Sequence, residues 1–193
     1  MSTVSYTLRT IAARQVTTGV PARTGIGVVA FALAMCFGAY VAVPLPWTPV
    51  PMTLQPLFVI LAGAVLGAGA GAAAMALYLA VGMAGAPVFS LGGAGIVWLM
   101  GPTGGYLVAM PAAAWLVGYA AGRSPGWGRL LGALTLGMAT IYLGGLAQLA
   151  ILTGEGLRTL LAVGLLPFLA GDVTKVLAAA LLARSVRSTS LGR

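Results

Sequence analysis

The sequence predicts an all-α integral membrane protein: a single domain, residues 1–193, in which six transmembrane helices form a bundle with both termini in the cytoplasm. Three observations lead to this fold class. Apolar residues make up 60% of the chain and charged residues 6%, against about 25% charged residues in a soluble domain. The apolar residues fall into six segments, each of which can satisfy its own backbone hydrogen bonds as a helix in lipid. The few arginines stand at the ends of these segments.

The expected helices follow one another along the chain. Residues 1–24 carry three arginines and no acid, and the apolar run that follows is too long for a signal peptide, so we expect a cytoplasmic or interfacial lead-in. That run ends at Pro44, the first of four prolines in eight residues that cannot continue a helix. The second and third segments are shorter than the roughly 20 residues of an upright span, and loops or local thinning of the bilayer are expected to accommodate them. We expect helices at about 25–43, 54–66, 71–85, 106–122, 130–152 and 160–183, followed by a basic cytoplasmic tail, 184–193.

The arginines predict the orientation of the bundle. With an even number of spans, both termini lie on the same side as the second–third and fourth–fifth connections. By the positive-inside rule the arginine-rich side is cytoplasmic, so the proline-rich connection 44–51 and the glycine-rich connection 86–105 are expected to face outside. The inner side collects Arg9, Arg14, Arg23, Arg123, Arg129, Arg184, Arg187 and Arg193, whereas the outer side holds Arg158, balanced by Glu155.

The residue types present exclude several function classes. The chain has no histidine and one cysteine, Cys36, so His-assisted nucleophilic catalysis and the usual metal sites of His and Cys are ruled out. The basic residues are scattered rather than clustered, so nucleic acid is not an expected partner. The glycine-rich stretch 67–71 belongs to no dinucleotide-binding unit, and no P-loop occurs, so ATP hydrolysis through that motif must come from another chain. We expect no cofactor and no bound metal.

The chemistry is concentrated in the last helix. Asp172 is one of two acids in the chain, and it lies three residues before Lys175 within an otherwise apolar helix. An ionisable residue inside a span costs roughly 2.5–3.5 kcal/mol on insertion scales, and such residues commonly mark function. Spacing of three puts both side chains on one helix face. Two interpretations stay open: a structural pair that neutralises itself, or a polar pocket in which Lys175 meets a substrate carboxylate and Asp172 accepts hydrogen bonds from ligand N–H groups.

Two further features allow both a functional and a structural interpretation. The connection 86–105 is either a lid or re-entrant loop whose backbone approaches a ligand, or a flexible link. In the first helix, a stripe of small residues at every fourth position permits close packing of membrane helices. We predict that Ala30 and Ala34 dock a partner membrane subunit; packing within the chain is the alternative. The full stripe is Ala30, Ala34, Gly38 and Ala42.

Three motifs together resemble the BioY family, the biotin-specific substrate-binding components of energy-coupling-factor transporters. The resemblance extends in order, spacing and length over nearly the whole chain. It implies a six-helix bundle with a biotin pocket near the outer surface, closed by the two outer connections. The motifs are Val43-Pro44-Leu45-Pro46-Trp47-Thr48-Pro49-Val50-Pro51-Met52-Thr53-Leu54-Gln55, Gly101-Pro102-Thr103-Gly104-Gly105-Tyr106 and Gly171-Asp172-Val173-Thr174-Lys175.

The resemblance also implies site residues. The aspartate and lysine of the family's last helix match Asp172 and Lys175, which would contact biotin. Some family members hold biotin with an Asn and an Arg from the region between the third and fourth helices. This chain has no Asn, and residues 86–105 contain no Arg, so Thr103, Ser90 or backbone groups would have to substitute. The candidates for the remaining contacts are Trp47, Gln55, Phe89, Thr103 and Tyr106.

The resemblance further implies partners: a membrane coupling subunit and two ATPase subunits in the inner membrane of a prokaryote, with this chain as a non-enzymatic component. The residues alone leave three alternatives open. The pocket could capture another vitamin, such as thiamin or riboflavin, or the chain could carry its substrate without an ATPase. Ser90 and Lys175 could instead form the dyad of an intramembrane enzyme, which would lose turnover in a Ser90→Ala variant.

Overall fold

A computed structural model describes residues 22–122 and 124–191 of the chain. Nearly all of the predicted lead-in lies outside the described residues, as do Arg9, Arg14, Arg123 and Arg193. The elements are α2 (Ala22–Tyr40), β1 (Ala42–Val43), β2 (Met52–Thr53), α3 (Gln55–Leu66), α4 (Ala68–Met83), a 3₁₀ turn (Ser90–Gly92), α5 (Ile96–Leu99), α6 (Gly104–Ala121), α7 (Trp127–Thr153), α8 (Leu157–Gly164), a second 3₁₀ turn (Leu166–Phe168) and α9 (Leu169–Leu191).

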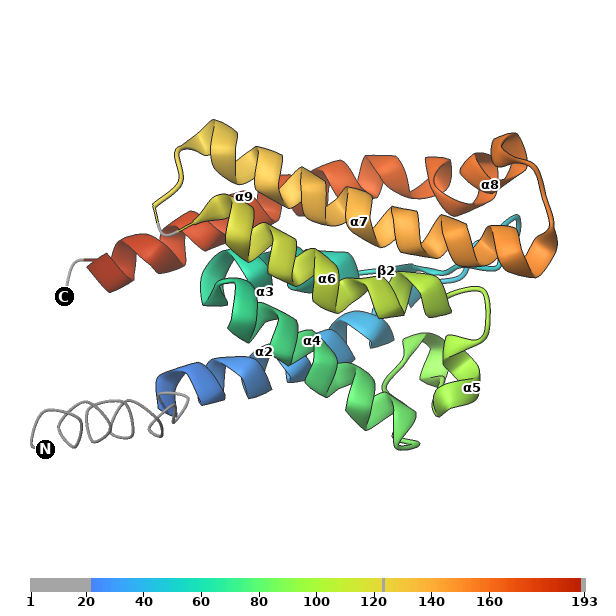
Figure 1. Cartoon of the computed structure of the whole chain (residues 1–193), viewed down its shortest axis with the longest axis horizontal. Coiled ribbons are helices and arrows are strands. Elements are labelled where there is room, and N and C mark those ends of the chain that lie inside the picture. Colours follow the sequence, from blue (N-terminus) through green and yellow to red (C-terminus); the bar gives the residue numbers. More distant parts are fainter. Residues whose placement is uncertain (1–21, 123, 192–193) are drawn as a thin grey trace, which may run out of the picture.

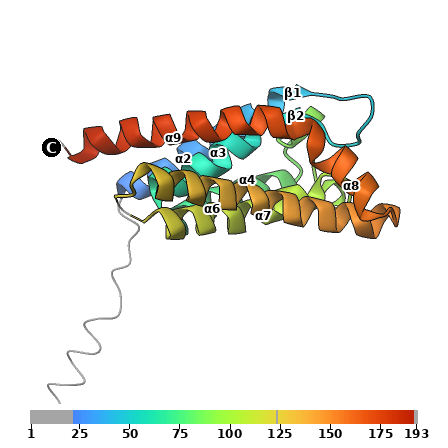
Figure 2. The same cartoon turned by 90° about the horizontal axis from the view of Figure 1, so that it is seen from above.

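The long helices lie along a common direction, and successive ones alternate in sense (Figure 1). The start of α2, the end of α9 and the short α3–α4 and α6–α7 connections share one end of the molecule. The opposite end carries the β1–β2 pair, α5 and α8 (Figure 2). We call this second end, with the connections 44–51 and 86–103, the loop end. The order of the helices therefore matches the predicted order of the apolar segments.

Helix α3 is the centre of the bundle and contacts α2, α4, α6, α7 and α9. Apolar residues cover its whole circumference, and Val59, Ile60, Ala62 and Ala64 are fully buried. A helix without a polar face is typical of a position enclosed by other helices. It ends at Gly67, whose φ of 84° strains any residue that carries a Cβ.

Glycines allow α3, α4 and α6 to approach one another closely. A Cβ added at Gly63 of α3 would collide with the carbonyl oxygen of Ala114 on α6. A Cβ at Gly118 of α6 would collide with the backbone at Ala68, where α4 begins. Lipid tails are as apolar as leucine side chains, so membrane helices associate through such close packing rather than through the hydrophobic effect.

Within the described residues, four helical regions are long and apolar enough to cross a membrane, by length and composition: Ala22–Tyr40, Gly104–Ala121, Trp127–Thr153 and Leu157–Val186. Helices α3 and α4 are equally apolar but have 12 and 16 residues. At 1.5 Å per residue they extend about 18 and 24 Å, against a hydrocarbon core of about 30 Å. The predicted all-α membrane fold is thus confirmed, with four helical regions that are long and apolar enough to cross a membrane.

The prediction of an unbroken last helix over 160–183 is wrong. Helix α8 ends at Gly164, and Leu165 has φ −135° and ψ −57°, outside the helical region. Pro167 accounts for the break, because it has no N–H to donate and restricts the residue before it. The 3₁₀ turn Leu166–Phe168 then leads into α9.

The connections at the loop end contain more order than the sequence pattern predicts. Strands β1 and β2 pair antiparallel, with Ala42 opposite Thr53 and Val43 opposite Met52. The connection 86–103 contains α5, and the Tyr40 hydroxyl donates to the Pro87 carbonyl oxygen at 3.1 Å. The connection 86–103 is therefore tied to the end of α2.

The small-residue stripe of α2 divides into two parts. Gly38 is buried, and a Cβ there would meet the ring of Phe58, so this part of the stripe packs within the chain. Ala30 is exposed and Ala34 is half-buried. Docking of a partner subunit at Ala30 and Ala34 stays a prediction.

Candidate ligand-binding site

A cavity of about 60 Å³ lies toward the loop end of the bundle. Its walls come from the segment that leads into α3, from the 3₁₀ turn at Ser90, and from α6, α7 and α9. Because these segments are far apart in the sequence, the cavity exists only once the bundle has assembled. The lining residues are Val50, Pro51, Thr53, Gln55, Pro56, Ser90, Thr103, Tyr106, Leu107, Met110, Met138, Ile141, Tyr142, Phe168, Asp172 and Lys175.

The cavity brings together six of the residues that the sequence predicts as ligand contacts. They come from four separate parts of the chain, and most of them are polar. Their presence at one cavity makes them available to a single ligand, and their roles in binding stay predictions. The six are Gln55, Ser90, Thr103, Tyr106, Asp172 and Lys175.

The charged part of the wall is the Asp172–Lys175 pair on α9. The two residues are 6% and 7% exposed, and Lys175 Nζ lies 2.7 Å from Asp172 Oδ1. Tyr142 of α7 donates a hydrogen bond to the other carboxylate oxygen, Oδ2. Buried charges are tolerated when they are paired and hydrogen-bonded. The pair is therefore neutralised within the protein and also faces the cavity, which is compatible with both interpretations of the sequence, and ligand contact at Asp172 and Lys175 stays a prediction.

The Asp172–Lys175 pair still has capacity for a ligand. An ammonium group has three N–H donors, and Lys175 uses one of them on Asp172. The carboxylate oxygens each have a second lone pair. The site can therefore donate to a carboxylate or carbonyl oxygen and accept from an N–H at adjacent positions.

Gln55 has its side chain held by a relay of hydrogen bonds. It is 3% exposed, and its Nε2 donates to the Tyr78 hydroxyl at 2.7 Å. The Tyr78 hydroxyl in turn donates to the Val88 carbonyl oxygen at 2.9 Å. The relay connects the cavity wall at the start of α3 to the connection that follows α4. A movement of that connection would therefore displace the Tyr78 hydroxyl that holds the Gln55 side chain.

Phe89 is predicted as a ligand contact but does not line the cavity. It is 1% exposed and packs edge-to-face on Tyr78, with 5.6 Å between ring centroids. It also covers Gly82 of α4, where a Cβ would collide with the ring. Phe89 thus lies behind the cavity wall and supports Tyr78, while its neighbour Ser90 faces the cavity.

Trp47 is also predicted as a ligand contact and is 63% exposed, away from the cavity lining. The conformation of the connection 44–51 explains its position. Thr48 Oγ1 donates to the Val163 carbonyl oxygen of α8 at 2.6 Å, which ties the connection to α8 at the loop end. Val50 is 7% exposed and forms part of the cavity wall in its place.

Tyr142 is the functional candidate that sequence reasoning missed. It lies within a long apolar helix, where a tyrosine can face lipid, core or ligand equally well. The available signal was a phenol in the middle of a predicted span, where its hydroxyl needs a partner. Tyr106, which was predicted, uses its hydroxyl to donate to the Gly164 carbonyl oxygen at 2.8 Å and so supports the break between α8 and α9.

The remaining wall is apolar. Met110 of α6, Met138 and Ile141 of α7, and Phe168 line it. In residues 22–122 and 124–191, no group of three or more His, Cys, Asp and Glu could hold a metal ion. The described site therefore combines one ion pair, several neutral polar groups and an apolar floor, which suits a small ligand with both polar groups and an apolar body.

The comparisons with known proteins agree on one family. Residues 9–191 match the model of the BioY family. A protein named probable biotin transporter BioY from Pyrococcus horikoshii is 38% identical over 142 residues, covering 74% of this chain and 83% of that protein. The biotin transporter BioY of Thermotoga maritima is 34% identical over 163 residues, covering 84% of this chain and 95% of that protein.

A solved structure shares the fold. It is described as the S-component for biotin from an ECF-type ABC transporter, and it superposes with a TM-score of 0.82. The match covers 90% of this chain and 95% of that chain at 24% sequence identity.

Proposed function

Because the chain belongs to the BioY family, we propose that it captures biotin and takes part in its uptake as the substrate-binding subunit of an energy-coupling-factor transporter. The observation that carries this proposal is the buried Asp172–Lys175 pair, which faces a cavity from a membrane helix. Ionisable residues inside a span typically mark the path or site of a substrate.

The chemistry of the cavity fits biotin. Its valerate carboxylate needs a cation, which Lys175 supplies, and its ureido ring needs an acceptor for N–H, which Asp172 supplies. The thiophane ring needs apolar walls, which Met110, Met138 and Phe168 supply. Ser90, Thr103, Tyr106 and Gln55 are the proposed polar contacts for the rest of the ligand.

Biotin binding requires the walls of the cavity to move outward. The cavity of about 60 Å³ is smaller than the roughly 300–1,000 Å³ of typical small-molecule sites. The connections 44–51 and 86–103 are the walls that we propose to move, because neither contains a long helix. Trp47 and Phe89 belong to these connections, and either could reach the ligand only after such a movement.

We further propose six spans with both termini cytoplasmic. The alternating direction of the helices supports an even number of crossings, with α3 and α4 as a short hairpin that turns at Gly67 (Figure 1). Arg129 and Arg184 lie toward the end where α9 ends, and Glu155 and Arg158 lie at the loop end, in keeping with the positive-inside rule. This orientation puts the cavity near the outer surface of a prokaryotic inner membrane.

The proposed partners are a membrane coupling subunit and two ATPase subunits. The absence of a P-loop from the sequence supports a separate source of ATP hydrolysis. On α2, exposed Ala30 is flanked by exposed Ile26, Val29 and Leu33. A small residue among large apolar ones allows another membrane helix to approach closely, so this face is the proposed dock, with Ala34 at its edge.

Binding of labelled biotin to the purified chain in lipid nanodiscs tests the proposal, with Asp172→Ala as the control. We expect saturable binding that the variant loses and that excess thiamin or riboflavin does not displace. Displacement by either vitamin would reassign the substrate, and no binding by folded protein would refute biotin capture. Uptake by cells with and without the partner subunits distinguishes a subunit from a stand-alone carrier.

A further inference from the structure

A second, larger hollow lies between α7 and α9 on the outside of the bundle. This groove has a volume of about 650 Å³. It shares three residues with the cavity, Met138, Tyr142 and Asp172, which form the partition between the two spaces. The groove is lined by Leu131, Thr135, Met138, Ala139, Tyr142, Leu143, Leu146, Leu165, Leu169, Asp172, Val173, Val176 and Leu177.

The shape of the groove favours a flexible hydrocarbon chain over another helix. Its α7 wall runs along one helix face for four turns, and nearly every lining side chain is apolar. Helix–helix contacts in membranes favour stripes of small residues that let backbones approach. Here the small residues Thr135 and Ala139 are confined to α7, and none of the α9 residues in the lining is Gly, Ala, Ser or Thr. A thin acyl chain can lie between such side chains where a helix cannot.

The groove leads toward a cationic group at the end of the molecule where α9 ends. Leu131 lies one turn after Trp127 on the same face of α7, and Leu177 lies two turns before Arg184 on the same face of α9. The Arg184 guanidinium stands over the Trp127 ring, 4.4 Å from its centroid, and so bridges the two helices beyond the groove. Arg184 is exposed, and a guanidinium carries five N–H donors that can meet a phosphate at the membrane surface.

We propose that the α7–α9 groove binds an acyl chain of an anionic phospholipid whose phosphate pairs with Arg184. The chain packs against the face of Tyr142 opposite the ligand cavity and fills the space beside the partition. In this position the lipid limits the freedom of Tyr142 and thereby of the carboxylate that Tyr142 holds. The inference goes beyond the proposed function, because the groove and its cation are present whatever ligand the cavity takes.

Photo-crosslinking tests this proposal on the full chain in nanodiscs. The probe is phosphatidylglycerol with a diazirine in one acyl chain, and the adducts are mapped by mass spectrometry. We expect adducts concentrated on the groove residues of α7 and α9. An even spread over the exposed faces of α2, α4 and α6 would mean annular lipid only and would overturn the proposal.

Two matched pairs of variants sharpen the test. Ala139→Phe fills the groove and should lower the groove adducts several-fold, whereas Ala112→Phe adds the same bulk on exposed α6 and should leave them unchanged. Arg184→Gln should reduce the preference for phosphatidylglycerol over phosphatidylcholine by about tenfold, as loss of a charge-assisted contact predicts, and exposed Arg158→Gln should not. Equal labelling of the two phenylalanine variants, or an unchanged lipid preference in Arg184→Gln, would contradict the assignment.

Discussion

Tyr142 on α7 and Asp172 on α9, 30 residues apart in sequence, are joined by a hydrogen bond from the phenol to the carboxylate. Lys175 holds the other oxygen of the same carboxylate from one turn further along α9. The orientation of Asp172 is thus set from two helices rather than one. A carboxylate held in this way presents its remaining lone pairs to the cavity without having to reorganise when a ligand arrives.

Tyr142→Phe tests whether the hydrogen bond from Tyr142 to Asp172 contributes to biotin affinity. The variant keeps the ring, which packs against Tyr106 with 6.4 Å between centroids, and removes the hydroxyl. Loss of a hydrogen bond to a charged group costs about 1.5–3 kcal/mol, so biotin affinity should fall by about tenfold or more.

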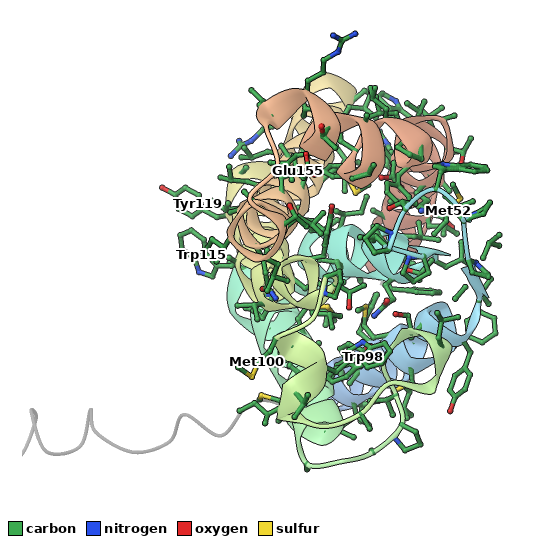
Figure 3. The ribbon with its side chains drawn as sticks, turned by 90° about the vertical axis from the view of Figure 1, so that its right-hand side faces the viewer. Met52, Trp98, Met100, Trp115, Tyr119 and Glu155 are labelled. Atoms are coloured by element: carbon green, nitrogen blue, oxygen red, sulfur yellow. The ribbon has the colours of Figure 1, made fainter. Side chains whose placement is uncertain are left out.

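The measurement for Tyr142→Phe is equilibrium binding of labelled biotin in nanodiscs. Tyr119→Phe is the control, because Tyr119 stacks on Trp115 and both side chains point away from the bundle (Figure 3). Equal affinities of the two variants would show that Lys175 alone orients Asp172.

Lys175→Met tests whether the Lys175 ammonium group binds the biotin carboxylate. The variant removes the proposed partner of the biotin carboxylate and leaves Asp172 as a buried charge held only by Tyr142. Breaking a buried ion pair by removing one partner destabilises a protein by about 3–5 kcal/mol, so both biotin affinity and thermal stability should fall.

The double variant Asp172→Asn with Lys175→Met separates the two effects of Lys175→Met. It removes both charges, so stability should recover much of its loss while biotin binding stays weak. Recovery of biotin binding in the double variant would show that the Asp172–Lys175 ion pair is not part of the binding site.

The sequence predicted the parts of the fold that depend on composition over many residues. Six apolar segments and their order follow from hydropathy, because a helix in lipid must be apolar over most of its length. The meeting of Asp172 and Lys175 on one face follows from helical spacing alone. Pro167 is the sequence signal for the break in the last helix, because proline lacks the N–H that a continuous helix needs.

The rest of the site depends on contacts that have no sequence period. Whether Trp47 or Val50 turns inward is decided by the bond from Thr48 to α8, which lies 115 residues away along the chain. Phe89 is placed by the gap that Gly82 leaves on α4, and Tyr142 by a carboxylate on another helix. Such pairings arise only when the helices have packed.

Gly118→Ala and Gly132→Ala form a test of the helix packing. Both glycines lie inside long helices, but a Cβ at Gly118 would collide with the backbone of α4, whereas nothing lies within 4 Å of a Cβ at Gly132. Overpacking typically costs 1–3 kcal/mol, and alanine in an open helical position gains about 0.5–1 kcal/mol over glycine. Thermal unfolding in detergent should therefore show a lower Tm for Gly118→Ala and an equal or higher Tm for Gly132→Ala. The same shift in both variants would argue against close α4–α6 contact.

Thr48→Val tests the connection 44–51 as the outer wall of the cavity. Thr48 Oγ1 donates to the Val163 carbonyl oxygen at 2.6 Å and accepts from the Val50 N–H at 3.2 Å. Valine has nearly the same shape and makes neither bond, so Val50 and Pro51 should leave the cavity more readily. Since each neutral hydrogen bond contributes about 0.5–1.5 kcal/mol, bound biotin should dissociate several-fold faster, and thermal stability should fall modestly.

A chase of labelled biotin by excess unlabelled biotin measures the dissociation rate of Thr48→Val. Thr140→Val is the matched control, because Thr140 Oγ1 donates to the Leu136 carbonyl oxygen within α7, away from the connection. If the wall must open for biotin to leave, only Thr48→Val accelerates release, and the effect lies in the dissociation rate more than in the association rate. If both variants release biotin at the rate of the unaltered chain, the ligand leaves by another route, and the connection 86–103 becomes the wall that moves.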